Sequence, residues 1–167
     1  MRDKDKQRNS TEPKGELASR TLAMPADSNP KGDIFGGWIM SLTDSAGEMS
    51  ATPHAGGRVV TVAVSNITFL HPVHVGDTVC CYTDVKRLGR TSITLDVEVW
   101  VLRQGQGTRI KVTDAEFTFV AVDEDGSPRE LASSVPARQP RGAREPRRAR
   151  RPPKGALSLM PSTPTLS

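Results

Sequence analysis

The sequence predicts an α+β domain in which one long helix covers a five-stranded antiparallel sheet. Only the stretch from Gly36 to about Ala51 has helical periodicity. The other regular stretches alternate with a period of two or are runs of β-branched residues, which is typical of strands. Short loops join the later strands and favour antiparallel neighbours. A single helix over such a sheet is an α+β arrangement.

Composition divides the 167 residues into a folded domain, residues 16–132, between two polar ends. We expect a flexible segment at residues 1–15 and a disordered Pro/Arg-rich tail at residues 133–167. Residues 137–167 hold eight basic residues and one acid, whereas residues 1–136 hold 15 basic and 18 acidic residues. The tail therefore carries the basicity. Because no aromatic residues are interleaved with its arginines, we expect a solvated tail and no nucleic-acid partner.

The first elements are a strand at residues 17–24, a turn-rich loop at 25–32 and then the helix. Pro53 and the glycine pair at 56–57 are predicted to end that helix. One buried stripe is expected along it, formed by apolar residues spaced three and four apart: Ile39, Leu42, Ala46 and Met49.

Four more strands follow, at residues 58–64, 78–85, 91–103 and 108–122, with hairpin signals at 88–90 and 104–107. The run Val99, Trp100 and Val101 predicts that the strand at 91–103 is buried on at least part of both faces. A sheet wrapped around a helix, or paired with another subunit, would meet this requirement. We therefore expect association.

Cys80 and Cys81 are adjacent, so on a strand their side chains point to opposite faces and form neither a disulfide nor a zinc site. Such cysteines fit a reducing compartment. The sequence lacks a stretch of about 18 apolar residues that could span a membrane, and no apolar segment follows the charged N-terminus. We expect a cytoplasmic protein with no membrane partner.

The start of the helix is the candidate catalytic feature. Backbone N–H groups at Gly36 and Gly37 would have no intrahelical acceptor and could hold a developing oxyanion, and Asp44 lies two turns later. Gly37 and Asp44 share one face but are roughly 10 Å apart along the axis. That is too far for one acyl carbon, which needs contacts near 3 Å. A two-fold dimer would bring Gly37 of one protomer towards Asp44 of its partner.

Other interpretations of the same residues are open. Asp44 could deprotonate a water or attack the carbonyl itself. The spacing alone favours a simpler interpretation, in which the glycines permit close packing and Asp44 is solvated. The histidines at 54, 71 and 74 lack the spacing of metal ligands and are interpreted as loop residues, so no metal is expected. The serines of the helix lack a nucleophile elbow, which argues against a serine hydrolase.

Several motifs together resemble the YciA-like branch of the hot-dog acyl-CoA thioesterases over about residues 20–132. They are RTLAMP at 20–25, GDIFGGWIM at 32–40 with Asp44, GRVVTV at 57–62, VGDTVCCY at 75–82, GRTSI at 89–93 and VEVWV at 97–101. The resemblance implies a helix wrapped by an antiparallel sheet, a dimer as the minimal active unit and further assembly into a hexamer. It also implies hydrolysis of acyl-CoA to a free acid and CoA, without a cofactor.

The resemblance also implies roles for individual residues. Asp44 falls at the position of the family's catalytic acid, and Asp33 at a loop position that helps to fix water or the thioester. Asn29 and Gly36 are expected to contact the substrate. The segment after the third strand would lie along CoA, with Arg and Lys on its phosphates and small donors on pantetheine. Its expected binding residues are Lys86, Arg87, Gly89, Arg90, Thr91 and Ser92.

Pro53 departs from this family, in which the helix continues, so we expect a shorter or shifted helix end. The Arg-rich tail has no recognised counterpart. Two rival functions are a hot-dog module that binds acyl-CoA without cleaving it, which Asp44 makes less attractive, and a nucleic-acid-associated protein tethered by the tail. A hot-dog dehydratase would need a histidine near the glycine pair, where none is present.

Overall fold

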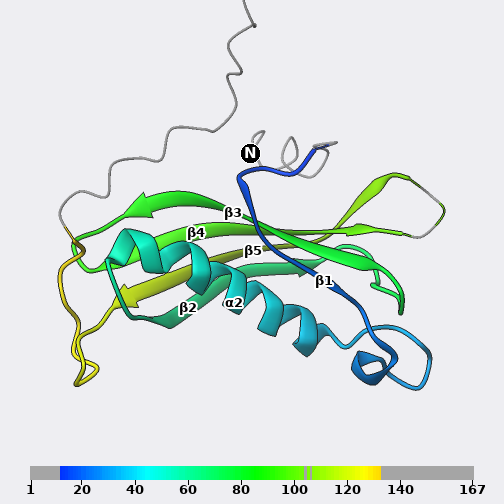
Figure 1. Cartoon of the computed structure of the whole chain (residues 1–167), viewed down its shortest axis with the longest axis horizontal. Coiled ribbons are helices and arrows are strands. Elements are labelled where there is room, and N and C mark those ends of the chain that lie inside the picture. Colours follow the sequence, from blue (N-terminus) through cyan, green and yellow to red (C-terminus); the bar gives the residue numbers. More distant parts are fainter. Residues whose placement is uncertain (1–11, 104, 106, 133–167) are drawn as a thin grey trace, which may run out of the picture. The chain divides into compact units, whose positions relative to one another are not determined.

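One helix, α2 (Gly36–Ala55), lies across a single sheet in the computed structural model (Figure 1). The structure describes residues 12–103, 105 and 107–132, so the predictions for residues 1–11 and 133–167 lie outside it. A short 3-10 turn, η1 (Pro25–Asp27), precedes the helix. The strands are β1 (Glu16–Leu22), β2 (Val59–Phe69), β3 (Thr78–Leu88), β4 (Ser92–Leu102) and β5 (Arg109–Ala121).

The sheet order is β1-β3-β4-β5-β2, and every neighbouring pair is antiparallel. This confirms the predicted α+β class with one helix on five antiparallel strands. β4 is central, and its residues are buried on both faces, as Val99 at 0% and Trp100 at 2% exposure illustrate. β1 and β2 form the two edges.

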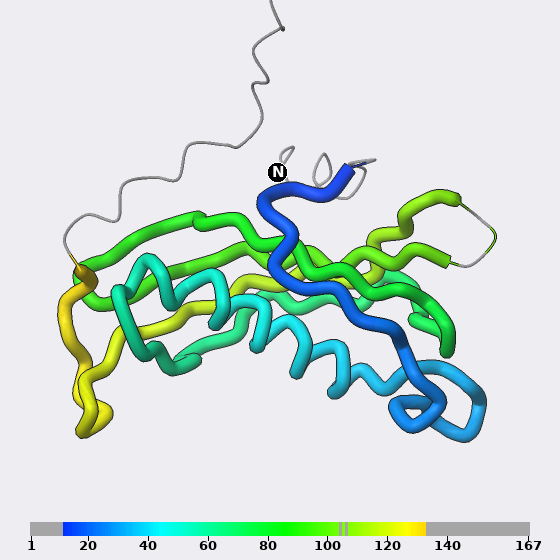
Figure 2. The backbone as a smooth tube through the Cα atoms, in the orientation of Figure 1, coloured from blue at the N-terminus to red at the C-terminus, as the bar shows by residue number. Residues whose placement is uncertain are grey.

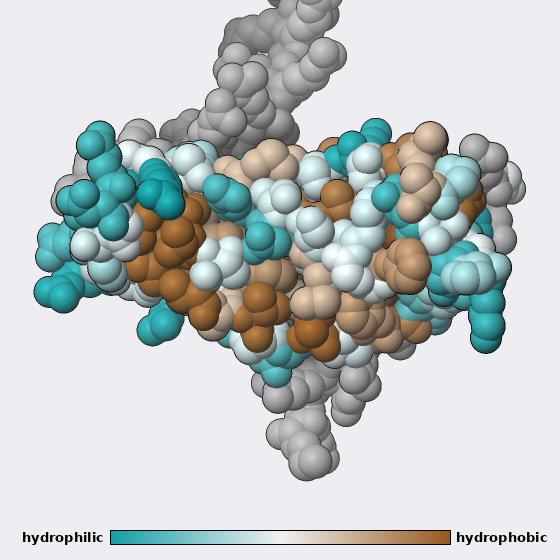
Figure 3. Space-filling model, turned by 90° about the horizontal axis from the view of Figure 1, so that it is seen from below, coloured by the Kyte–Doolittle hydropathy of each residue, from teal (hydrophilic) through white to brown (hydrophobic). Residues whose placement is uncertain are grey.

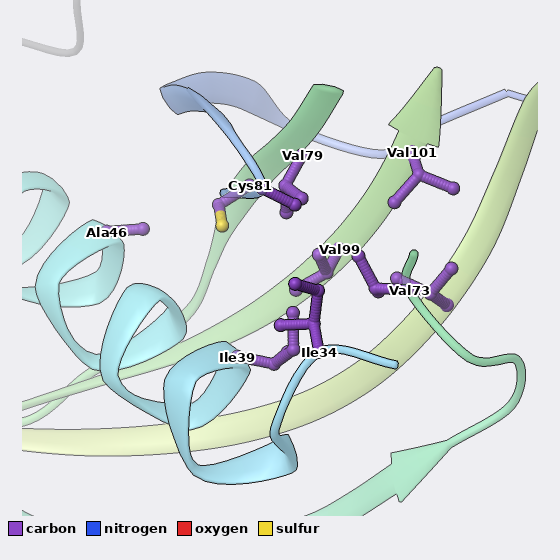
Figure 4. Close-up of a cluster of buried hydrophobic side chains, with 10 residues drawn as sticks. Ile34, Ile39, Ala46, Val73, Val79, Cys81, Val99 and Val101 are labelled. Atoms are coloured by element: carbon purple, nitrogen blue, oxygen red, sulfur yellow. The ribbon is translucent and has the colours of Figure 1, made fainter. Parts of the chain in front are cut away.

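The core lies between α2 and the sheet. Figure 4 shows Ile34, Ile39, Val73 and Val99 converging there, near the start of the helix. A second cluster, near the end of the helix, contains Phe117 and Phe119 on β5. At Gly47 the helix comes so close to the sheet that an added Cβ would lie 2.7 Å from the Phe119 ring. Helix and sheet therefore pack tightly at this glycine.

The buried stripe of α2 differs from the predicted one. Ile39 and Ala46 are buried as expected, but Met49 is 52% exposed and Leu42 is only half-buried. Small residues occupy the packed face instead, namely Thr43, Gly47, Ala51 and Ala55. This packed face follows a row of residues spaced four apart, and Met49, two residues after Gly47, lies about 200° around the helix from it, so its side chain faces away from the sheet. The prediction for Met49 was therefore wrong.

The helix also runs past Pro53 to Ala55, so the predicted early end was wrong. A proline removes one hydrogen bond to the residue four positions earlier, and in the last turn few further bonds depend on it. Gly56, with φ of 66°, ends the helix in the left-handed conformation. His54 consequently lies in the last helical turn and not in a loop.

Two strands are longer than predicted because irregular pairing carries them on. β2 continues to Phe69 through a register shift between Ser65 and Thr68 along β5, with Asn66 at a positive φ of 56°. β3 continues to Leu88 through a shift after Val85. The other bounds agree with the predictions to within two residues.

Cys80 and Cys81 lie on opposite faces of β3, as expected. Cys81 belongs to the core under α2, where burial raises the pKa of its thiol. Cys80 packs with Tyr82 and Trp100 on the other face. No helix among the described residues is long and apolar enough to cross a membrane.

Candidate functional site

The start of α2 is left open. Its N-cap, Phe35, offers no side-chain hydrogen bond to the first helical amides. Gly36 and Gly37 are both exposed, and nothing lies within 4 Å of the place where a Gly37 Cβ would be. The first N–H groups of a helix have no intrahelical acceptor, and they project from its N-terminus, which is the positive end of the helix dipole. The Gly37 N–H can therefore be reached by an incoming carbonyl oxygen.

Asn29 organises the loop that leads into this helix. Its Oδ1 accepts the backbone N–H of Lys31 at 2.9 Å and of Asp33 at 3.1 Å, and its own N–H donates to the Asp33 carbonyl at 2.7 Å. Asp33 Oδ1 lies 3.6 Å from Nε2 of His74, and both side chains are nearly half exposed. The predicted residues Asn29, Asp33, Gly36 and Gly37 are thus near neighbours at one end of the molecule.

Asp44 lies where the helix faces β2. Its Oδ1 accepts a 2.6 Å hydrogen bond from Oγ1 of Thr61 on that strand. Asp44 is half-buried and Thr61 is exposed, so solvent reaches the carboxylate. Because β2 is an edge of the sheet, this pair lies where a second protein chain could approach.

A buried ion pair fixes the loop between β2 and β3. Asp77, whose side chain is 3% exposed, accepts two hydrogen bonds from Arg103, at 3.0 and 3.2 Å, and one from the His74 N–H at 3.0 Å. Burial alone would raise the pKa of Asp77, but these donors outweigh it and hold the pKa below its usual value. Arg103 also donates to the Pro72 carbonyl. Residues 72–77 are therefore tied to the end of β4.

The predicted CoA-binding hairpin lies at the opposite end of the sheet, beside the C-terminal end of α2 (Figure 2). The Ala121 N–H donates to the Thr91 carbonyl, and the Leu131 N–H to the Arg90 carbonyl. Gly89 makes a tight turn, since its N–H donates to the Ser92 carbonyl at 2.7 Å and an added Cβ would lie 2.6 Å from Oγ of Ser92. Within one protomer, this hairpin and Gly37 are therefore far apart.

The cations of this hairpin differ in their surroundings. Lys86 Nζ is paired with Glu116 and Asp96 on the face of the sheet away from α2. The hydrogen bond with Glu116 raises the pKa of Lys86 and lowers that of Glu116. Arg87 is exposed, and Arg90 lies 3.9 Å from Glu130 with both side chains well exposed. Arg87 and Arg90 are therefore more available to a phosphate than Lys86.

Apolar side chains lie exposed along the edge that carries Asp44. Val62 and Phe69 on β2 are 54% and 49% exposed, and Met40 and Met49 on α2 are 41% and 52% exposed. Figure 3, viewed from the helix side, shows apolar side chains spread over this face. An edge strand flanked by such residues is suited to a second copy of the chain.

The sequence reasoning missed Thr61, Asp77 and Arg103. Thr61 reads as an ordinary β-branched strand residue, and only the packing of β2 against α2 brings it to Asp44. Asp77 stands in a Gly-Asp turn, a signal for a loop rather than for an ion pair. Its partner Arg103 is 26 residues away in the sequence, and only the pairing of β3 with β4 brings the two residues together.

Comparison with known proteins gives concordant results. A family model described as the thioesterase superfamily matches residues 31–108. The acyl-CoA thioester hydrolase YciA of Salmonella typhimurium is 56% identical over 122 residues, which is 71% of this chain and 92% of that protein. The hexameric thioesterase y2039 of Yersinia pestis has a TM-score of 0.69 at 56% identity, covering 72% of this chain and 98% of that one. Cj0915 of Campylobacter jejuni, a hexameric hotdog fold thioesterase, has a TM-score of 0.68 at 42% identity, covering 71% and 91%.

Proposed function

The chain belongs to the YciA-like acyl-CoA thioester hydrolases of the thioesterase superfamily, and we propose that it hydrolyses acyl-CoA to a free acid and CoA at a site shared by two protomers. Asp44 of one protomer supplies the carboxylate, and the Gly37 N–H of its partner holds the thioester oxygen. The observation that carries this proposal is the 2.6 Å bond between Thr61 and Asp44, at the exposed edge of the sheet.

Each residue has a distinct part in the reaction. Thr61 fixes the rotamer of Asp44 by donating to Oδ1, which leaves Oδ2 to take a proton from water or to attack the carbonyl carbon. The partner's Gly37 N–H stabilises the charge that develops on the thioester oxygen, and the helix dipole adds to it. Collapse of the tetrahedral intermediate expels the CoA thiolate; when Asp44 is the nucleophile, water then hydrolyses the acyl-Asp44 anhydride to the free acid and restores the carboxylate. Asp33 and Asn29 hold the loop beside this oxygen.

A shared site requires association. Hexamers are described for y2039 and Cj0915, and we propose that this chain forms dimers through β2 and α2 that assemble further. The exposed apolar residues of that edge, Val62, Phe69, Met40 and Met49, support it. In such a dimer the hairpin that carries Arg87 and Arg90 would meet the site from another protomer, so these two arginines bind the CoA phosphates.

The decisive experiment mixes two inactive variants. Asp44→Ala and Gly37→Pro are each expected to lose nearly all turnover of acyl-CoA, measured by thiol release across short to long acyl chains. A mixed dimer contains one site with neither change, so mixed refolding should restore about a quarter of wild-type activity. Mixing each variant with itself is the control. No recovery would contradict a shared site, and near-normal turnover by Asp44→Ala would contradict the mechanism.

A second measurement separates the two roles of Asp44. Single turnover in oxygen-18 water, followed by mass spectrometry of the Asp44 peptide, should find label in the carboxylate if Asp44 attacks the carbonyl. Label confined to the acid product, with no acylated Asp44 peptide in rapidly quenched samples, would indicate a general base. Thr61→Val is expected to lower kcat by at least tenfold in either case, because it frees the carboxylate to rotate.

A further inference from the structure

A cavity of about 320 Å³ adjoins the open start of α2. Most of its lining residues are apolar, and they come from the start of the helix and the residues before it, the end of β2 and the segment that follows, and one residue of β5. Ile34, Ile39 and Val73, which Figure 4 shows side by side, belong to these walls. The remaining lining residues are Gly36, Phe69, Leu70, His71, Pro72 and Thr113. Nothing in the proposed reaction uses Thr113.

A β-bulge brings Thr113 to this wall. Along β4 and β5, Val99 pairs with Thr113 and Trp100 with Lys111, so Val112 is the extra residue. Without this residue the side chains would simply alternate across the sheet. With it, Val112 lies in the core under α2 and Thr113 opposite Val99, which is also in that core. Bulges of this kind re-aim side chains beside functional sites.

The Thr113 hydroxyl is buried and has no partner. The residue is 1% exposed, and in the part of the chain that the structure describes its Oγ1 is the one buried side-chain nitrogen or oxygen without a hydrogen bond. Buried polar groups are nearly always paired. If this position only had to pack against its apolar neighbours, valine would serve better, because it has the same shape without the hydroxyl. Because Thr113 lines the cavity, an oxygen atom of a ligand bound there can supply the missing partner.

We propose that this cavity receives the acyl group, and that the Thr113 hydroxyl selects acyl chains that carry a hydroxyl or keto oxygen. This inference rests on the proposed function, since it names the substrate class of the same site. Gly36 lines the cavity, so an acyl chain whose carbonyl lies at the helix start would extend along Ile34 and Ile39 towards Thr113 on β5. His71 adds a second polar group to the lining. A site that binds a substrate oxygen rejects the analogue that lacks it, because its own polar group then stays unpaired.

The test measures binding by calorimetry to the full chain with Asp44→Asn, which prevents turnover. The probes have matched chain length: butyryl-CoA, 3-hydroxybutyryl-CoA and 4-hydroxybutyryl-CoA. One hydroxylated probe is expected to bind about tenfold more tightly than butyryl-CoA, and Thr113→Val should abolish this preference. Thr113→Ser, which keeps the hydroxyl, is the matched control and should retain most of the preference.

Equal affinity for all three probes in the parent chain, or no binding of any, would overturn the inference even if no Thr113 variant folds. A preference that survives Thr113→Val would overturn it too. Hydrolysis of the same thioesters by the chain with intact Asp44 tests the proposed function separately. A preference that depends on Thr113, without hydrolysis, would reject the proposed function and leave the cavity's selectivity standing.

Discussion

The two ends of α2 are completed in opposite ways. At its C-terminal end, Gly56 adopts the left-handed conformation. The Ala55 carbonyl there accepts hydrogen bonds from the Arg129 side chain at 2.9 Å and from the Ala132 N–H at 3.4 Å. At its start, Phe35 supplies no side-chain bond and the glycines are exposed. The closed end uses its polar groups for stability. The open end keeps its N–H groups available for a ligand.

The open end is held in place indirectly. Its own amides lack caps, but the loops on either side are fixed by Asn29 and by the ion pair of Asp77 with Arg103. A binding site of this kind needs rigid surroundings, because preorganised donors lose no energy to reorientation when charge develops. The comparison therefore predicts that changes at the start of α2 affect catalysis, and changes at its end affect stability.

Removing the Gly37 N–H should have the largest effect. Gly37→Pro is expected to lower kcat by about 10²- to 10³-fold, the usual loss for one oxyanion donor. Proline is tolerated in the first turn of a helix, so circular dichroism should show the helix retained. Gly37→Ala keeps the N–H, and its Cβ has open space. An equal loss of kcat in Gly37→Ala would show that the N–H is not what matters.

Breaking the ion pair beneath the open end should have the next largest effect, on stability. Asp77→Asn leaves Arg103 without its charge partner and is expected to lower the free energy of unfolding by about 3 kcal/mol in urea titrations. Because the pKa of Asp77 is lowered in the folded state, its contribution is present above the unfolded pKa of about 3.9 and disappears as pH falls through the folded pKa.

Urea titrations at several pH values check the sign of this effect. The difference between wild type and Asp77→Asn should be constant near neutral pH and shrink below about pH 4. Arg103→Gln, which removes the other partner, is expected to lose a similar amount. A difference between the proteins that grows as the solution becomes more acidic would contradict the assignment.

The sequence predicted the architecture because periodicity and turn signals act locally. One helical stretch, four runs of β-branched residues and short hairpins were enough for the sheet and its helix, and the glycine pair marked the open end. The burial of β4 on both faces was also visible in the run Val99, Trp100 and Val101. Periodicity, turn signals and runs of β-branched residues all depend on residues that are close together in the chain, so they can be recognised in the sequence alone.

What the sequence did not give depends on packing between distant segments. Met49 has a spacing typical of the core, but the helix packs on the sheet through its row of small residues around Gly47, which leaves Met49 exposed on the other side. Lys86 has the right chemistry for a phosphate, yet its position on β3 brings it to Glu116 on another strand. Thr61 and Thr113 became candidates only through a contact across elements and a bulge in the register.

Opening the closed end should have the smallest effect and leave catalysis intact. Arg129→Ala removes hydrogen bonds to the carbonyls of Ala55, Val122 and Glu130 and is expected to lower the free energy of unfolding by about 2 kcal/mol. Arg129→Lys can restore one of these bonds at most, so its free energy of unfolding should lie between those of wild type and Arg129→Ala. Urea titration at fixed protomer concentration measures the loss, and acyl-CoA turnover at 25 °C should stay within twofold of wild type. A large fall in kcat would mean that the two ends of α2 are coupled, because the hydrogen bonds of Arg129 reach neither Asp44 nor Gly36 and Gly37.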